Sequence, residues 1–182
     1  MNGASTLIKW LLAAPHGMPI ERCGATAMFA SISGCAVDAV MQSRGPRELT
    51  RSEQQLLQSM DSTTGHERRG TLYADNVAAA ATTAVLVPQR LPAGVRATLG
   101  IGPDGETLPG IAGVPLGRVL SGLGVRREPL SVVATPGEHD TAGYEFILRS
   151  AARLWLERPI GIVTERVYAE FLHAFPIRRA AK

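Results

Sequence analysis

Two stretches of alternating apolar and polar residues, each broken by a short turn, dominate the pattern of this chain. Strand-like runs flank turn residues 74–76 within residues 68–87, and they flank residues 157–159 within residues 149–171. Alternation with a period of two is typical of strands with one buried face, and a short turn between two such runs predicts a hairpin. Arginines lead into both hairpins, and we expect the two to share one antiparallel sheet.

Helical spacing of apolar residues predicts short helices elsewhere in the chain. The predicted helices lie within residues 5–14, 26–33, 47–60 and 114–123. Thr50 and Glu53 have the spacing of a capping box, which marks the start of the third helix. Further strands are predicted over residues 35–42 and 130–134, a loop that includes a helical turn over residues 92–113, and a loop over residues 135–141.

This order of elements predicts an α+β fold in which a single antiparallel β-sheet is covered by helices. The chain has no βαβ alternation and no glycine-rich phosphate loop, which argues against a nucleotide enzyme. Its 182 residues suit one domain spanning residues 1–182. Apolar residues make up 45% and charged residues 19%, as in ordinary globular proteins, so we expect the chain to fold alone.

Charge and cysteine usage narrow the classes of partner. The net charge of +3 is spread over scattered arginines, which favours a small anionic ligand over nucleic acid. No stretch approaches the about 18 apolar residues of a membrane span, so we expect no membrane partner. Cys23 and Cys35 lack the spacing of metal ligands, and the Glu-His-Asp run at residues 138–140 lies in an expected loop. We therefore expect no metal.

One acidic residue stands in the apolar pattern of the last predicted strand. Gly161, Val163, Glu165 and Val167 share one face of that strand, and the other three are apolar. Desolvating an ionised carboxylate is costly, so Glu165 is paired with a cation, bound to a ligand, or held protonated. Each of these states is compatible with a catalytic acid. The alternative is an edge strand whose glutamate reaches solvent.

Three segments follow one another along the chain in a distinctive order. Residues 68–75 (RRGTLYAD) precede residues 85–88 (VLVP), then come residues 115–120 (PLGRVL), and residues 149–171 contain a Thr-Glu pair. Together they resemble the chorismate pyruvate-lyase family. That family has an arginine-headed hairpin, a proline-leucine-glycine-arginine loop with a helix, and a last hairpin that carries a threonine-glutamate pair. The resemblance implies a chorismate lyase-like domain.

The resemblance also implies roles for four residues. Arg68 would bind a substrate carboxylate, Glu165 would be the acid-base residue, and the backbone of Leu116 and Gly117 would hydrogen-bond the ligand. A guanidinium holds a carboxylate bidentately, in a fixed orientation that lysine would not provide. Neighbouring strand residues point to opposite faces, so only one of Arg68 and Arg69 can face the pocket.

Two further assignments stay open at this point. The family's ligand-covering residue corresponds to Met18, Ala25 or Met28. Arg118 lies in the predicted helix after Gly117, where its side chain is expected in solvent or paired with Glu128.

The implied function is that of an enzyme, a chorismate lyase that eliminates pyruvate from chorismate to give 4-hydroxybenzoate. Glu165, kept protonated by an apolar pocket, would supply general acid-base catalysis. Aromatisation of the ring drives the reaction, so no cofactor is expected. The expected protein is a cytoplasmic monomer whose partners are chorismate and the aromatic product.

A non-catalytic alternative belongs to the same fold, a small aromatic-acid binding or sensor protein. The effector-binding domains of one large group of bacterial transcription regulators share the fold implied by the resemblance. Such a regulator needs a helix-turn-helix ahead of this domain, and the first 60 residues are assigned to the domain itself. The enzyme is therefore favoured.

Overall fold

The computed structural model describes residues 7–8, 18–59, 63–111 and 113–177. Among these residues, seven strands form one sheet in the order β1-β5-β6-β7-β4-β3-β2. The strands are β1 (Met18–Pro19), β2 (Val37–Glu48), β3 (Thr64–Ala74), β4 (Val77–Leu86), β5 (Arg126–His139), β6 (Glu145–Trp155) and β7 (Pro159–Tyr168). Every neighbouring pair is antiparallel. The predicted α+β class with a single antiparallel sheet is confirmed.

Both predicted hairpins form, and they meet in the middle of the sheet. The turn between β3 and β4 places Asp75 and Asn76 at φ of 47° and 63°, a left-handed geometry that Asn and Asp tolerate and that tight hairpins require. The second hairpin joins β6 to β7. Strand β7 then pairs with β4, which sets Thr82 opposite Glu165. The sheet therefore places residues from the two hairpins on one continuous face.

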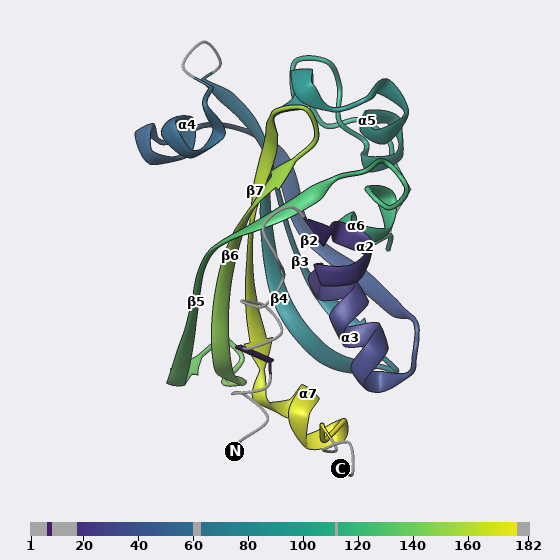
Figure 1. Cartoon of the computed structure of the whole chain (residues 1–182), viewed down its shortest axis with the longest axis vertical. Coiled ribbons are helices and arrows are strands. Elements are labelled where there is room, and N and C mark those ends of the chain that lie inside the picture. Colours follow the sequence, from purple (N-terminus) through teal and green to yellow (C-terminus); the bar gives the residue numbers. More distant parts are fainter. Residues whose placement is uncertain (1–6, 9–17, 60–62, 112, 178–182) are drawn as a thin grey trace.

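Helices cover one face of the curved sheet (Figure 1). They are α2 (Ile20–Cys23), α3 (Ala25–Ser33), α5 (Ala93–Leu99), α6 (Leu116–Val119) and α7 (Ala169–Ala174), with a short 3-10 turn at Pro88–Arg90. Helix α4 (Arg51–Leu57) packs on the opposite face, where Leu57 clusters with Val85 and Ile162. In Figure 1, α2, α3 and α6 lie side by side over the sheet, while α4 projects at one end. The predicted helix start at Thr50 is confirmed, because Thr50 and Glu53 form both bonds of a capping box.

Two hydrophobic clusters hold the helices of the first face against the sheet. The first packs α3 and α7 onto the sheet through residues such as Phe29 and Phe171, whose rings meet edge to face with centroids 4.8 Å apart. The second packs α2, α5 and α6 onto the sheet around Leu86, Leu120 and Leu154. The region between these two clusters contains the cavity described below.

Three expectations differ from the structure. The loop predicted over residues 135–141 is wrong, because β5 continues to His139 through a register shift between Ala134 and Glu138 and pairs with the start of β6. The helical turn expected within residues 92–113 is longer in the structure, where it forms the seven-residue helix α5. The helix predicted over residues 114–123 shortens to the four residues of α6. The helix expected within residues 5–14 lies almost wholly outside the described residues.

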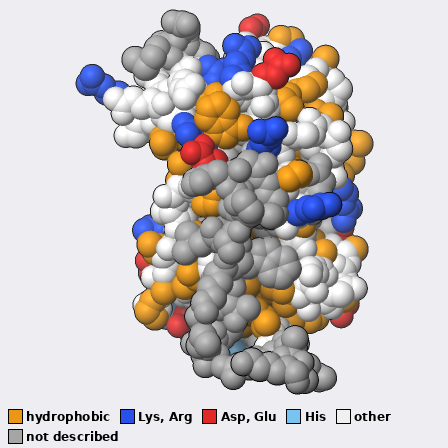
Figure 2. All heavy atoms as spheres, in the orientation of Figure 1, with side chains coloured by type: hydrophobic (Ala, Val, Ile, Leu, Met, Phe, Trp, Pro, Cys, Tyr) orange, Lys and Arg blue, Asp and Glu red, His pale blue; other side chains and the backbone are white. Residues whose placement is uncertain are grey.

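The surface carries its charge in a dispersed way. On the face seen in Figure 2, Lys and Arg side chains lie mainly in the upper half, and hydrophobic side chains are interspersed with polar ones. None of the helices in the described part of the chain is long and apolar enough to cross a membrane.

Candidate functional site

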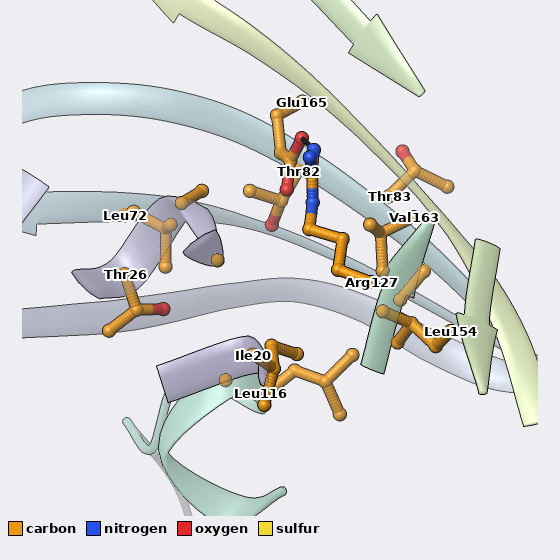
Figure 3. Close-up of a pocket in the computed structure, with 14 residues that line it drawn as sticks. Ile20, Thr26, Leu72, Thr82, Thr83, Leu116, Arg127, Leu154, Val163 and Glu165 are labelled. Carbon is orange, nitrogen blue, oxygen red and sulfur yellow. Dashed lines mark hydrogen bonds and ion pairs between the residues drawn. The ribbon is translucent and has the colours of Figure 1, made fainter. Parts of the chain in front are cut away.

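A cavity lies on the helix-covered face of the sheet, between the two hydrophobic clusters. Its larger part, the Glu165 compartment, has a volume of about 60 Å³ and is bounded by β3, β4, β5, β6, β7 and helices α2, α3 and α6 (Figure 3). Its smaller part, the Arg68 compartment, has a volume of about 30 Å³. The two compartments share four lining residues, namely Leu72, Thr82, Ala84 and Leu116. They therefore lie next to each other on the same sheet face.

The walls of the Glu165 compartment are mostly apolar. Ile20 and Leu116 come from α2 and α6, and Leu72, Leu154 and Val163 come from the strands. The predicted alternation along the last strand explains why Val163 and Glu165 face this space together. An apolar site with a few convergent polar groups is the usual character of a small-molecule pocket.

Glu165 is buried and held by two side chains from neighbouring strands. Arg127 on β5 donates from Nη2 to Glu165 Oε2 at 2.9 Å, and the hydroxyl of Ser150 donates to the same oxygen. Ser150 lies directly opposite Glu165 in the register of β6 and β7. Arg127 is only 1% exposed, so both charges of this ion pair are withdrawn from water. Of the three states expected for Glu165, the structure has the one paired with a cation.

This pairing bears directly on the predicted acid-base role. A guanidinium and a hydroxyl that donate to a carboxylate stabilise its ionised form, whereas a proton donor must carry the acidic hydrogen. Within these apolar surroundings, Nη2 of Arg127 lies 2.9 Å from Oε2 of Glu165. Glu165 therefore has the geometry of the anionic member of a buried ion pair.

The surroundings of Arg68, which lines the Arg68 compartment, differ from those of Arg127. Its side chain is buried, and among the described residues its one polar contact runs from Nη2 to the sulfur of Met41 at 3.6 Å. Nε and Nη1 are buried and have no hydrogen-bond partner in the described part of the chain. Burial, together with the nearby charge of Arg44, lowers the pKa of Arg68 to about 10. The guanidinium is still charged at neutral pH and lacks a counterion.

The ambiguity between Arg68 and Arg69 is resolved by the strand. Arg68 faces the cavity, and Arg69 points to the other side of the sheet, where its Nε lies 2.7 Å from Glu67 Oε1. The side chain of Arg69 is 57% exposed. Of these two arginines, Arg68 is therefore the one that lines the cavity.

The other residues named from the resemblance fall around the same cavity. Leu116 and Gly117 line it from α6, and a Cβ on Gly117 would approach Thr26 Oγ1 to 3.0 Å, so glycine allows α6 to pack closely on α3. Ala25 lines the cavity, whereas Met28 is fully buried in the first hydrophobic cluster.

The side chain of Met18 lies outside the described part of the structure. Among the three residues considered for covering the ligand, Ala25 is therefore the one that is seen at the cavity.

The side chain of Arg118 is half exposed to solvent, as expected, and it does not pair with Glu128. It donates from Nη2 to the backbone oxygen of Val37 at 2.8 Å and lies 3.9 Å from Asp38, which ties α6 to β2. Glu128 binds Arg153 and Trp155 instead.

The acidic and histidine run at residues 138–140 has a structural role on the opposite face of the sheet. Asp140 accepts hydrogen bonds from the backbone of Ala142 and Tyr144 and from the hydroxyl of Tyr168. Burial, reinforced by Asp140, raises the pKa of Tyr168 to about 12. These contacts fold the β5–β6 turn back onto the sheet.

Sequence reasoning missed Arg127. The strand predicted there began at residue 130, whereas β5 begins at Arg126. The sequence contained a signal for the buried position of Arg127. Arg127 comes two residues after Val125, which is fully buried. Residues two apart in a strand point to the same face of the sheet. Extending the strand by four residues would have placed an arginine on the buried face.

Comparisons with known proteins identify the fold. No protein-family model matches the sequence, and no curated protein matches it either. Among solved structures, the effector domain of PhnF from Mycobacterium smegmatis matches with a TM-score of 0.55 at 14% identity, over 80% of this chain and 90% of that one. The chain has the fold of this effector domain.

Two further matches agree with it. The C-terminal domain of the histidine utilization repressor from Pseudomonas syringae pv. tomato has a TM-score of 0.50 at 13% identity, over 80% of this chain and 97% of that one. The ligand-binding domain of a GntR-family regulator from Bordetella bronchiseptica has a TM-score of 0.50 at 14% identity, over 80% and 91%. Against the longer PhnF chain, the match covers 61% of that protein.

These comparisons correct the expectation of an enzyme. The structures named above are the effector domain of PhnF, the ligand-binding domain of a regulator and the C-terminal domain of a repressor. Within the site, Glu165 is engaged by Arg127 and Ser150. The prediction of a chorismate lyase enzyme is therefore wrong.

Proposed function

We propose that this chain is a non-catalytic binding domain for a small aromatic carboxylic acid, whose carboxylate is bound by Arg68. The observation that carries the proposal is the buried guanidinium of Arg68, with two donor nitrogens unpartnered beside a cavity. Leaving buried donors of a charged group unsatisfied is costly, and a carboxylate would supply both the acceptors and the missing charge.

The rest of the cavity suits the ring of such an acid. Leu72, Ala84 and Leu116 border both compartments, so a ligand bound at Arg68 would extend between apolar walls toward the Glu165 compartment. Burial of an apolar ring against these walls would add affinity to the ionic contact.

The predicted contact of the Leu116 and Gly117 backbone with the ligand stays a prediction, as do the single domain over residues 1–182 and the cytoplasmic location.

The experiment is isothermal titration calorimetry with benzoate and 4-hydroxybenzoate, using benzamide as a neutral control. We expect saturable binding of the acids and none of the amide. Arg68→Met should remove binding, whereas Arg69→Met, a matched change one residue along on the other sheet face, should leave it unchanged. Equal binding of acid and amide, or retained affinity in Arg68→Met, would contradict the proposal.

A second measurement separates binding from turnover. Chorismate is incubated with the protein, and pyruvate is assayed over time. We expect no release of pyruvate above the rate in buffer, while the aromatic acids still bind.

A further inference from the structure

We infer that the ligand is a monocarboxylate with a neutral hydrogen-bond acceptor at its far end, and that Arg127 binds this acceptor. The inference rests on the proposed function and adds a second contact to it. Arg127 lines the Glu165 compartment, whereas Arg68 lines the adjoining Arg68 compartment. A ligand anchored at Arg68 and extending along the shared walls reaches Arg127.

Two of the three guanidinium nitrogens of Arg127 have no hydrogen-bond partner among the described residues. Its Nη2 contacts Glu165 Oε2 at 2.9 Å and lies 3.4 Å from the Ser150 hydroxyl, so one nitrogen serves both strand neighbours. Nε and Nη1 are buried and have no partner among the described residues. Figure 3 shows the guanidinium end of Arg127 beside Glu165 and near Thr82, on the cavity side of the strands. A guanidinium has five N–H donors, and an acceptor on the ligand would satisfy those left over.

The charges around the cavity decide what kind of acceptor fits. Arg68 contributes one positive charge without a counterion, while the charge of Arg127 is already balanced by Glu165. The net charge of these three residues is therefore +1, which one carboxylate neutralises. A second anionic group would be placed near Glu165, in a site whose low dielectric makes repulsion between like charges costly. The carboxylate belongs at Arg68, and the group at Arg127 is a carbonyl, an ether or a hydroxyl.

Two matched pairs of ligands test the inference in the unmodified protein by calorimetry. The first pair is 4-carbamoylbenzoate and terephthalate, which have nearly the same shape but carry one and two negative charges. The second pair is 4-methoxybenzoate and 4-ethylbenzoate, which differ in an acceptor oxygen against a methylene group. We expect 4-carbamoylbenzoate to bind more tightly than terephthalate, because it places no second negative charge near Glu165. We expect 4-methoxybenzoate to bind about tenfold more tightly than 4-ethylbenzoate, the ratio that one net hydrogen bond to a charged donor supplies.

Two variants assign the preference to named residues. Glu165→Gln keeps the shape and the acceptor for Arg127 but removes the negative charge, which raises the net charge of the three positions to +2. Its preference should reverse, so that terephthalate binds more tightly than 4-carbamoylbenzoate. The double variant Arg127→Met with Glu165→Gln returns the net charge to +1 and leaves no buried charge unpaired at this end. It should lose the distinction between 4-methoxybenzoate and 4-ethylbenzoate, whereas Arg69→Met, on the other face of the sheet, should keep it.

The outcomes separate this inference from the proposed function. If none of these acids binds, both fail. If they bind but terephthalate is preferred by the unmodified protein, or the double variant still prefers the methoxy compound, the role of Arg127 fails while binding at Arg68 stands.

Discussion

The two ends of the cavity contain the same functional group in opposite circumstances. At one end the buried guanidinium of Arg127 has a carboxylate and a hydroxyl within the protein. At the other end the buried guanidinium of Arg68 has only a methionine sulfur and the repulsion of Arg44. Arg44 itself is satisfied, because it donates to the backbone oxygens of Leu99 and Leu108. Among these three arginines, Arg68 is the one that lacks an acceptor oxygen.

The difference separates a charge that the protein balances from a charge that a ligand would balance. The ion pair of Arg127 and Glu165 is balanced in charge without ligand, although Nε and Nη1 of Arg127 have no hydrogen-bond partner among the described residues. A buried charge without a partner raises the free energy of the folded chain, and a ligand of opposite charge would lower it. Glu165, the residue that the sequence marked most strongly, therefore lies at the charge-balanced end, and Arg68 lies at the end where a charged ligand group would bind.

The largest effect on stability is expected at the charge-balanced end. Arg127→Met removes the cation and leaves the carboxylate of Glu165 buried beside Ser150, so the free energy of unfolding should fall by about 3–5 kcal/mol. The double variant with Glu165→Gln should recover most of this loss, because no unpaired charge remains. Urea unfolding followed by circular dichroism measures both. Equal losses in the single and double variants would show that packing of the arginine, and not charge pairing, dominates.

A smaller effect of opposite sign is expected at Arg68. Arg68→Met removes a buried charge that has no partner, and the flexible methionine can fill the space, so the ligand-free protein should gain about 1–3 kcal/mol. The variant should lose the stabilisation that ligand gives the unmodified protein, about 2.7 kcal/mol at one hundred times Kd. Thermal unfolding with and without 4-hydroxybenzoate measures both changes. A destabilised Arg68→Met protein would mean that Arg68 is a structural residue.

Much of the fold was predictable because its signals are local. The turn at residues 74–76, the capping box of Thr50 and Glu53, and the period-two pattern around Glu165 each depend on neighbouring residues. The length of β5 was not predictable in the same way, since its second half is extended by pairing with β6 across a register shift. Within the site, the sequence indicated which residues carry charge toward the cavity, but it did not indicate which side chains pair with one another.

The pairing of Arg127 with Glu165 shows why. The two residues are 38 positions apart, and they meet only because β5, β6 and β7 are adjacent in the sheet. The same pairing turns the predicted acid into a counterion. The function class was misjudged for that reason, while the orientation of Arg68 over Arg69 followed from alternation once the strand was known.

The smallest expected effect is a dependence of stability on pH that comes from His66. It tests whether a further positive charge is unfavourable at the Arg68 end of the cavity. His66 is fully buried on the same strand, its Nδ1 lies 2.8 Å from the backbone oxygen of Gly105, and its Nε2 has no partner among the described residues. Burial lowers the pKa of His66, and the charges of Arg68 and Arg44 lower it further. The unfolded chain therefore takes up a proton near pH 6.5 that the folded protein resists.

Stability should consequently be lost as the pH falls below about 6.5, with a slope that approaches 1.4 kcal/mol per pH unit for one proton. Urea unfolding between pH 8 and pH 5 measures it. His66→Gln should flatten this slope, whereas His139→Gln, a matched change at an exposed histidine, should leave it in place. Arg68→Met should reduce the slope only in part, because desolvation is the largest cause of the shift and remains. If His66→Gln does not change the slope, another group causes the loss of stability in acid. The unpaired charge of Arg68 would then be the sole electrostatic penalty at this end of the cavity.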